Sequence, residues 1–392
     1  MPMINRIFER KVRSLLLNNP AVVLMGPRQV GKTTLAKQIL NDYKKSCIYL
    51  DMENRRDKLK LSDPVSYFER YPDHLIIIDE VQTEPSLFTD MRPAIDMKRK
   101  NGRFLLLGSA SPGLISGASE SLGGRIDYLE IPPFIYPELK GASNTDKHWI
   151  RGGFPLSFTA KNNALSMQWR NAFITGYIRM DFSLLFNREI NSTIISNFWT
   201  MLAHVSGGLW NAHTFSKSLG VSVPTVKKYL DYLEYAFLTR RLQPWHVNTA
   251  KRLVKSPKIY IRDSGLLHTL LNLQDLDDVL SHPIAGNSWE GYVIEQISNL
   301  LPNTIKPYFF RSHQGAEADL VLVKGITPIA AIDIKLSNAP AISKGFYESI
   351  KDLKTKSNFV ITPAGDDYIG KENIQYCSLP VFFDKYFHSL KT

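Results

Sequence analysis

Residues 21–40 read AVVLMGPRQVGKTTLAKQIL, and this stretch decides the fold of the N-terminal part of the chain. Its first five residues are apolar and partly β-branched, which is typical of a strand buried in a parallel sheet. The next eight fit the pattern GxxxxGK[ST], and Leu35 and Ile39 then lie four positions apart, on one face of a helix. A strand, a glycine-containing loop and a helix in this order predict a phosphate-binding loop.

Nucleotide chemistry explains why these residue types occur together. Glycines let the backbone wrap closely around phosphate groups, and the amides of the loop and of the helix N-terminus point at the anion. We expect Lys32 to reach the β- and γ-phosphates and the Thr33 hydroxyl to ligate Mg²⁺. The sequence therefore predicts ATP and Mg²⁺ as cofactors, held by the loop residues Gly26, Pro27, Arg28, Gln29, Val30, Gly31, Lys32, Thr33 and Thr34.

Two further apolar runs end in polar residues. The run 75–78 leads into Asp79 and Glu80, and the run 104–107 is followed closely by Ser109. We expect Asp79 to hold Mg²⁺, largely through water, and Glu80 to orient or deprotonate the attacking water. Ser109 is the candidate for a hydrogen bond to the γ-phosphate or to that water. An acidic pair can also merely cap a strand, and a lone serine can be a routine turn, but the loop upstream favours the catalytic interpretation.

The composition excludes several classes of protein. With 392 residues, 44% hydrophobic and 22% charged, the chain is globular and has room for two or three domains of ~150 residues. Two cysteines cannot staple such a chain, and no CxxC or Cys/His pattern indicates zinc. We find no signal peptide or membrane-spanning run, so we expect a soluble, cytoplasmic protein. The net charge of +11 is compatible with a polyanionic partner and equally with a merely basic surface.

Four motifs resemble those of a bacterial and archaeal group of AAA-type ATPases: GPRQVGKTTL at 26–35, IIIDEVQ at 76–82, LLLGSASP at 105–112 and ESLGGR at 120–125. In that group the ATPase precedes a C-terminal region with a winged helix and a restriction-endonuclease-like core. The resemblance implies that Ser109 acts as a sensor. It makes Arg125 a candidate γ-phosphate or subunit-contact arginine, with Arg151 a weaker one, although both can be structural. AAA-type proteins often form rings, so a homo-oligomer is also a candidate state, which the sequence does not fix.

The middle of the chain predicts helices and a basic hairpin. The proline-dense stretch 131–137 marks the end of the sheet domain, and residues 164–202 predict a helical connector or lid. Residues 215–224 predict a helix, a glycine turn and the start of a second helix, whose apolar side recurs at Val226, Leu230, Leu233 and Phe237. The opposite side could face a DNA groove, as in helix-turn-helix modules, through Ser222, Thr225, Lys227 and Lys228.

A basic segment follows, and it could form a two-stranded wing with strands at 238–242 and 259–261. Its cations are Arg240, Arg241, Lys251, Arg252, Lys255 and Lys258. Such a module can bind DNA, or it can serve only as a protein–protein adaptor, and a run of charge can be no more than a solvated face.

The C-terminal region predicts the element order α-β-β-β-α-β. Within it, Asp319 and the run Asp333-Ile334-Lys335 resemble the PD-(D/E)xK pattern of restriction-endonuclease-like nucleases. Residues two apart in a strand project from one face, so Asp333 and Lys335 are expected to point together, with Asp319 nearby on the next strand. Carboxylates are hard ligands for Mg²⁺, and a lysine can position water or stabilise phosphate charge. Glu290, on the preceding helix, matches the extra acid of junction-resolving members of that superfamily.

The nuclease pattern has two departures, because no proline precedes Asp319 and an aspartate stands at 333. Nuclease-like folds also persist as modules that do not cut. We therefore predict an α/β protein with a P-loop parallel-sheet ATPase domain at 1–140, a helical connector at 141–205, a winged-helix-like module at 206–275 and a nuclease-like domain at 276–392. The expected function is Mg²⁺-dependent ATP hydrolysis coupled to DNA binding or cleavage. The alternatives are an ATP-switched scaffold that never cuts, or a signalling regulator that acts on other proteins.

Overall fold

The computed structural model describes residues 4–41, 43, 46–109, 122–139, 145–177, 191–246, 253–337 and 340–391. Their contacts divide the chain into two compact units. Among the described residues, the first unit comprises those up to Phe134 together with Tyr235–Leu238, and the second unit comprises the others.

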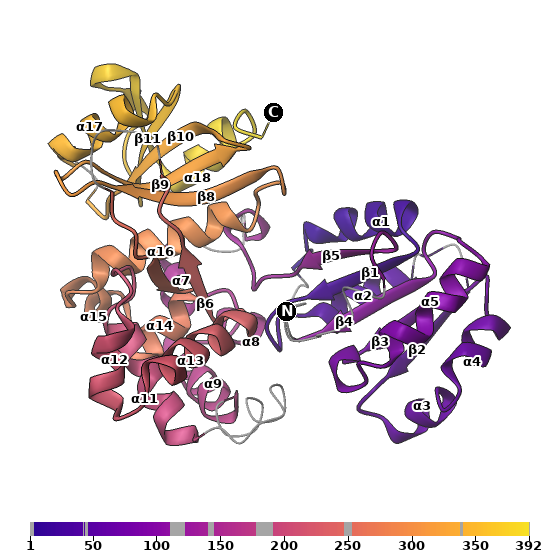
Figure 1. The fold of residues 1–392 in the computed structure, drawn as a ribbon. Coiled ribbons are helices and arrows are strands. Elements are labelled where there is room, and N and C mark those ends of the chain that lie inside the picture. Colours follow the sequence, from indigo (N-terminus) through magenta and orange to yellow (C-terminus); the bar gives the residue numbers. More distant parts are fainter. Residues whose placement is uncertain are drawn as a thin grey trace. The chain divides into compact units, whose positions relative to one another are not determined.

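The first unit is built on a five-stranded parallel sheet, drawn in indigo and purple in Figure 1. Its strands lie in the order β2-β3-β4-β1-β5. They are β1 (Ala21–Met25), β2 (Cys47–Asp51), β3 (Leu75–Asp79), β4 (Phe104–Gly108) and β5 (Ile126–Glu130). Strands β1, β3 and β4 are buried along their whole length, as expected for continuous apolar runs in a parallel sheet. The predicted P-loop sheet is confirmed, because all strands point their carboxyl ends to one edge.

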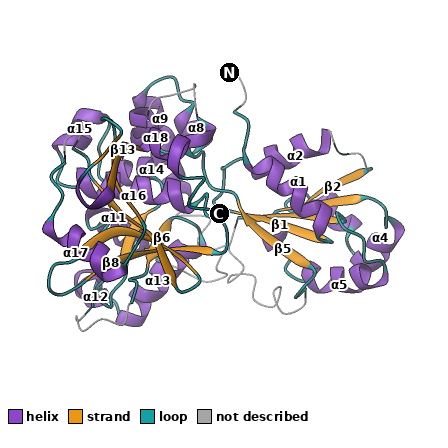
Figure 2. Ribbon diagram, turned by 90° about the horizontal axis from the view of Figure 1, so that it is seen from above, coloured by secondary structure: helices purple, strands orange, loops and turns teal. Residues whose placement is uncertain are grey.

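Helices cover both faces of this sheet (Figure 2). One face carries α1 (Phe8–Asn18) and α2 (Lys32–Asn41), and the other carries α4 (Pro64–Arg70) and α5 (Leu87–Met97). The short helix α3 (Arg55–Lys60) follows β2. Side chains of β1, β3 and β4 that alternate along each strand pack with Phe68 and Phe88 into one core. The helix α2 begins at Lys32, directly after the glycine loop, as its sequence predicts.

The second unit begins with a helical part. It contains α7 (Thr145–Arg151), α8 (Pro155–Phe158), α9 (Asn163–Gly176), α11 (Ser192–His204), α12 (Ala212–Leu219), α13 (Val223–Tyr235), α14 (Ser264–Leu270) and α15 (Leu276–Ser281). Gly220 ends α12 in the left-handed conformation that favours glycine, with φ 65°. An antiparallel hairpin of β6 (Thr239–Leu242) and β7 (Lys258–Ile261) follows α13. The predicted helix, glycine turn and second helix are present, and so are the two predicted strands after them.

A six-stranded mixed sheet completes the second unit, in the order β12-β13-β11-β10-β9-β8. The strands are β8 (Ile305–Arg311), β9 (Glu317–Lys324), β10 (Thr327–Ile334), β11 (Ser357–Thr362), β12 (Tyr368–Ile369) and β13 (Ile374–Ser378). Strands β8, β9 and β10 are antiparallel to one another, whereas β10, β11 and β13 run parallel. The predicted order from α16 (Ala285–Ser298) to β11 is present, and the sequence analysis missed β12 and β13.

Two helices sandwich this sheet (Figure 1). The helix α16 (Ala285–Ser298) packs through Trp289 and Val293 against one face, together with aromatic side chains that follow α18 (Leu379–Val381). The helix α17 (Lys344–Leu353) packs through Phe346 and Ile350 against the other face. Strands β9 and β10 are therefore buried on both sides, and the polar residues on them lie in a protected environment.

Candidate functional site

The phosphate loop joins β1 to α2 and is shaped by its glycines. Gly26 has φ 146°, and a Cβ atom there would lie 2.2 Å from the main-chain oxygen of Ile131. The main chain is this close because the Ile131 N–H donates to the Met25 oxygen at 2.7 Å. Only glycine fits at position 26, so the loop passes tightly against the segment after β5. Of the other loop residues, Val30 is buried, whereas Gln29 and Thr34 are exposed.

Arg6 braces the loop from outside the motif. Its guanidinium donates one hydrogen bond to the Val30 oxygen and one to the Pro132 oxygen, each at 2.7 Å, and the side chain is buried. The loop residue Arg28 lies 3.6 Å from the carboxylate of Glu53. Sequence reasoning missed Arg6, because nothing local links position 6 to a loop more than twenty residues away.

Lys32 lies over the loop that precedes it. Its ammonium donates to the main-chain oxygens of Gly26, at 2.8 Å, and Pro27, at 2.7 Å. The side chain is almost fully buried, and this burial lowers the pKa of Lys32 to about 8, although Glu80 and Asp79 oppose the effect. A buried cation among loop carbonyls gains from an anion placed beside it, so the geometry suits a phosphate-binding lysine.

Asp79, at the end of β3, is the centre of a small hydrogen-bond network. Its Oδ2 accepts from the Thr33 hydroxyl at 2.7 Å and from the Tyr49 hydroxyl at 2.5 Å, and its Oδ1 accepts from the Glu80 N–H at 2.9 Å. Burial and the neighbouring Asp79 raise the pKa of Tyr49, which keeps the phenol protonated as a donor. The paired hydroxyl and carboxylate of Thr33 and Asp79 are hard oxygen donors and fit Mg²⁺ bound with a nucleotide.

Tyr49 was missed by the sequence analysis. It stands on β2, the strand next to β3. A tyrosine in an apolar strand gives no signal of its own. Its role becomes visible only once the two strands are paired.

Glu80 is held by two polar neighbours. It has φ 54°, a left-handed conformation that is unusual for a residue other than glycine. Its Oε2 accepts hydrogen bonds from the Gln82 amide and from the Ser109 hydroxyl, the latter at 3.3 Å. The Gln82 Oε1 in turn accepts from the Ser109 N–H at 3.2 Å. The structure therefore brings Ser109 to Glu80, and Gln82, which sequence reasoning quoted without a role, links the two.

Arg125 does not lie near the phosphate loop of its own chain. Its main-chain oxygen accepts from the N–H of Ala21, the first residue of β1, whereas the loop follows the last residue of that strand. Its guanidinium forms a two-point ion pair with Asp96 at 2.6 and 3.0 Å. Arg125 therefore does not contact a nucleotide bound by the same chain. Arg125 and the phosphate loop lie at opposite ends of β1, which extends about 3.3 Å per residue. A contact across subunits stays a prediction.

Arg151 has a structural environment in the second unit. Its Nε donates to the Asn163 Oδ1 at 2.8 Å and its Nη1 to the Ala160 oxygen at 2.6 Å. These bonds tie α7 to the start of α9.

A second group of charged residues lies on β9 and β10 and on the elements that pack against them. We call Glu290, Glu317, Asp319, Asp333, Lys258 and Lys335 the acidic centre. Lys335 donates to the Asp333 Oδ1 at 2.6 Å and lies 3.8 Å from the Asp319 Oδ2. The predicted proximity of Asp319, Asp333 and Lys335 is therefore observed. Burial and the adjacent Asp319 raise the pKa of Asp333 to about 7.

Glu290 joins the acidic centre through Lys258. The Lys258 ammonium lies 3.0 Å from the Glu290 Oε1, and Tyr260 donates to the same oxygen. Burial and the nearby Asp319 raise the pKa of Glu290 to about 7. The expectation that Lys258 belongs to a basic DNA-facing wing is wrong, because its side chain is buried among carboxylates. Within the described ranges, no three His, Cys, Asp or Glu side chains are grouped to hold a metal ion. The expected metal site of Glu290, Asp319 and Asp333 is therefore not formed in this arrangement.

The rest of the basic hairpin is also less free than its sequence suggests. Arg240 pairs with Glu295 at 2.6 Å, and Arg241 pairs with Asp231 at 2.6 Å. Lys255 is exposed, whereas Lys251 and Arg252 lie outside the described residues. On α13 the predicted faces are confirmed, with the apolar residues Val226, Tyr229, Leu230 and Leu233 buried and the cations Lys227 and Lys228 exposed.

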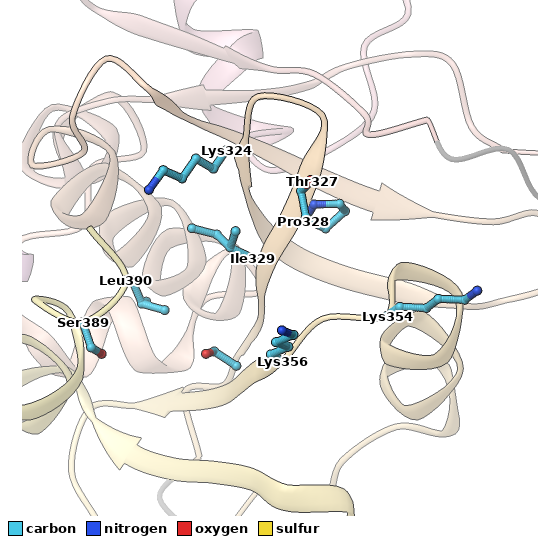
Figure 3. A pocket seen from close by; sticks show the side chains of 9 residues that line it. Lys324, Thr327, Pro328, Ile329, Lys354, Lys356, Ser389 and Leu390 are labelled. Atoms are coloured by element: carbon cyan, nitrogen blue, oxygen red, sulfur yellow. The ribbon is translucent and has the colours of Figure 1, made fainter. Parts of the chain in front are cut away.

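A cavity of about 320 Å³ opens at the other end of β9 and β10. Figure 3 shows Lys324, Lys354 and Lys356 around an apolar floor that includes Ile329 and Leu390. The ammonium groups of Lys324 and Lys354 point in different directions (Figure 3), so they do not converge on one anion.

Across the part of the chain that the structure describes, we find no helix both long enough and apolar enough to span a bilayer.

Comparisons with known proteins agree with the geometry of the first unit. Residues 18–140 match the family described as AAA domain, and residues 143–277 and 285–382 match two families described as domains of unknown function. An uncharacterized protein of Mycobacterium tuberculosis is 40% identical over 354 residues, covering 90% of this chain and 78% of that protein. An uncharacterized protein of Mycobacterium bovis matches with the same identity and coverage.

Solved structures also resemble the chain. A Walker-type ATPase of Pyrococcus abyssi is 15% identical, with a TM-score of 0.46, and the match covers 69% of this chain and 96% of that one. The RuvB Holliday junction branch migration motor of Thermotoga maritima is 18% identical, with a TM-score of 0.29, and the match covers 61% of this chain and 90% of that one.

Proposed function

The chain belongs to the same protein family as the two mycobacterial proteins, and we propose that its AAA domain binds ATP with Mg²⁺ and hydrolyses it. One observation carries the proposal: the carboxyl edge of a single parallel sheet brings together the glycine loop, Lys32, the Thr33–Asp79 pair and Glu80. P-loop ATPases place their phosphate-binding and water-activating groups at this edge.

Each group has a role that follows from its position. Lys32 would neutralise charge on the β- and γ-phosphates, and Thr33 with Asp79 would hold Mg²⁺. The metal supplies further neutralisation of the phosphates when it is bound. Glu80 would align the attacking water or take its proton, and Ser109, hydrogen-bonded to Glu80, would respond to the state of the γ-phosphate.

Two variants test the ATPase proposal. We expect Lys32→Ala to abolish ATP binding in calorimetry, because the loop loses the buried ammonium that lies over the Gly26 and Pro27 oxygens. Glu80→Gln should keep ATP binding and stop phosphate release. Glu84→Gln, which alters a half-buried acid nearby that pairs with Lys58 at 2.8 Å, is the matched control and should keep both. Normal hydrolysis by Glu80→Gln would show that its assigned role is wrong.

We propose that the second unit contains a winged-helix-like module at 206–275, after a connector at 141–205, and that this module contacts DNA. The exposed Lys227 and Lys228 on α13, which follows the turn at Gly220, support the proposal. The test is fluorescence anisotropy with labelled duplexes at low and moderate salt, using the native protein and a Lys227→Ala/Lys228→Ala variant. Absence of affinity at low salt would favour an adaptor that acts on other proteins.

For the domain at 276–392, we propose a nuclease-like centre, with cleavage and a non-cutting scaffold as its two possible functions. The contacts among Asp319, Asp333 and Lys335 support the nuclease-like interpretation. Lys258, placed among the carboxylates, favours the scaffold. Incubation of varied DNA structures with Mg²⁺ or Mn²⁺ separates the two. Product that disappears in Asp333→Ala and in Lys335→Ala supports cleavage, and no product from any substrate supports the ATP-switched scaffold.

Assembly is a further part of the proposal. Arg125 is held by Asp96 away from the phosphate loop of its own chain, so a nucleotide contact by Arg125 requires a second copy. Light scattering with and without ATP measures the oligomeric state. Loss of turnover in Arg125→Ala without loss of ATP binding would support the contact across subunits.

A further inference from the structure

The ammonium of Lys258 lies among three carboxylates from two structural elements. It is 3.0 Å from the Glu290 Oε1 on α16, and 3.4 and 3.8 Å from the Glu317 Oε1 and the Asp319 Oδ1 on β9. Its own strand, β7, is paired with β6 and with Leu209 on the other side. The Lys258 side chain is only 5% exposed to solvent. The lysine is therefore a buried part of the acidic centre and does not reach into it from solvent.

A lysine in this position occupies the space that a cation ligated by these carboxylates needs. Divalent cations take carboxylate oxygens at about 2.0–2.6 Å, and the three oxygens nearest to Lys258 already surround an ammonium. A metal ion there would share its carboxylate ligands with the buried ammonium of Lys258. The repulsion between these two positive charges is large, because a buried site screens charges poorly. The arrangement of the native chain therefore does not fit a divalent cation between Glu290, Glu317 and Asp319.

Asp319 is bracketed by two lysines. Its Oδ1 faces Lys258, and its Oδ2 lies 3.8 Å from the Lys335 ammonium and accepts from the Ile334 N–H at 2.9 Å. Asp333 adds a fourth buried carboxyl group to the centre. It is 3% exposed, its Oδ1 accepts from the Lys335 ammonium, and it shares a further hydrogen bond with the Asp319 carboxyl group.

We propose that Lys258 is the resident cation of the acidic centre, so that the native chain binds no divalent cation there, and that removing its ammonium opens a divalent-cation site. The inference rests on the nuclease-like domain of the proposed function, since it concerns the same carboxylates, and it states how their metal chemistry is regulated. Cleavage that depends on a metal would require the β7 hairpin to withdraw Lys258 first.

The test measures Mn²⁺ binding to the full chain without nucleotide, by electron paramagnetic resonance of the free ion. Five proteins are compared: native, Lys258→Met, Asp319→Asn, Lys258→Met/Asp319→Asn, and Lys255→Met. Methionine keeps the apolar stem of the lysine and removes its charge. Lys255→Met is the matched control, because it removes an exposed charge just before the same strand. We expect a new site in Lys258→Met, at least about tenfold tighter than any site in native protein, that the Asp319 change removes.

Two results would overturn the inference. One is a Mn²⁺ site in native protein that a single Asp319→Asn change removes. The other is a Lys258→Met protein that is folded by circular dichroism and binds no Mn²⁺ beyond the native level. Should Lys258→Met fail to fold, the comparison of native with Asp319→Asn still tests the first half of the inference, that the native centre binds no divalent cation. ATP turnover and DNA cleavage are measured in separate assays, so failure of the proposed function is distinguishable from failure of the Lys258 proposal. A Mn²⁺ site in native protein would support cleavage and refute the Lys258 proposal.

Discussion

Substitution of Glu295 by glutamine should destabilise the second unit in a pH-dependent way. The carboxylate of Glu295, on α16, accepts from the Arg240 Nε at 2.6 Å and from the Arg262 Nε at 2.7 Å. Asn299 donates to it as well, at 3.1 Å. Arg240 lies on β6 and Arg262 directly follows β7, so Glu295 fastens the hairpin to the helix that carries Glu290.

The size of the effect follows from the ionisation of Glu295. Burial by itself would raise its pKa, but the charges of Arg240 and Arg262 outweigh burial and lower the pKa from 4.5 to about 2. One pKa unit corresponds to about 1.4 kcal/mol, so the ionised group contributes about 3 kcal/mol to the free energy of unfolding. Because the folded pKa is depressed, this contribution is complete above the unfolded value of 4.5 and is lost as the pH falls towards 2. At pH 3 about half of it remains.

Differential scanning calorimetry of native and Glu295→Gln protein measures the difference. At pH 7 the transition of the second unit should fall by about 6–12 °C, since 1 kcal/mol corresponds to about 2–4 °C for a domain of this size. At pH 3 the difference should be about half as large. Glu372→Gln, which alters an exposed acid that pairs with Lys351 at 3.6 Å, is the control and should shift little. An equal shift at both pH values, or none at pH 7, would refute the reasoning.

Three further predictions concern the nucleotide site. Gly26→Ala should weaken ATP binding about tenfold or more in calorimetry, because its Cβ would lie 2.2 Å from the Ile131 oxygen. Gln82→Ala should lower kcat about 10- to 100-fold, with KM for ATP nearly constant, because Glu80 loses a hydrogen bond that orients it. Burial holds the pKa of Lys32 near 8, so ATP affinity should fall about tenfold from pH 7 to pH 9, but stay level in Lys32→Arg. Native-like binding by Gly26→Ala, an unchanged kcat in Gln82→Ala, or the same pH profile in native and Lys32→Arg protein would each contradict its prediction.

The nucleotide site was predictable where its residues form local patterns. The loop from Gly26 to Thr33 is one contiguous stretch, and Asp79 and Glu80 end an apolar run whose burial in a parallel sheet is plain from its composition. Arg6 and Tyr49 were not predictable in this way. Each acts on the site across more than twenty residues of sequence, through a contact that exists only after the strands have paired.

The acidic centre was also predictable only where its residues form a local pattern. The strand period of two predicted that Asp333 and Lys335 share a face, and their 2.6 Å contact follows from it. The environment of Lys258 was predicted wrongly, because a lysine between a proline and an apolar strand is usually solvated. No acidic residue close to it in the sequence indicates that it is buried among carboxylates. Its partners, Glu290 and Asp319, come from elements more than thirty residues further along the chain.

These ion pairs also change the expected electrostatics of DNA binding. Arg240, Arg241 and Lys258 are each paired with carboxylates of the same unit, so these three cations add little free positive charge to the surface of this module. Lys217, Lys227, Lys228 and Lys255 are the exposed lysine and arginine side chains of the described module segments 206–246 and 253–275. If these four contact phosphates, the logarithm of the DNA affinity should fall against the logarithm of salt concentration with a slope of about −3.6. A slope steeper than about −6, measured by anisotropy between 50 and 200 mM salt, would exceed what these four and the two cations outside the described residues, Lys251 and Arg252, can supply. It would require the paired arginines to leave their carboxylates and would contradict this assignment.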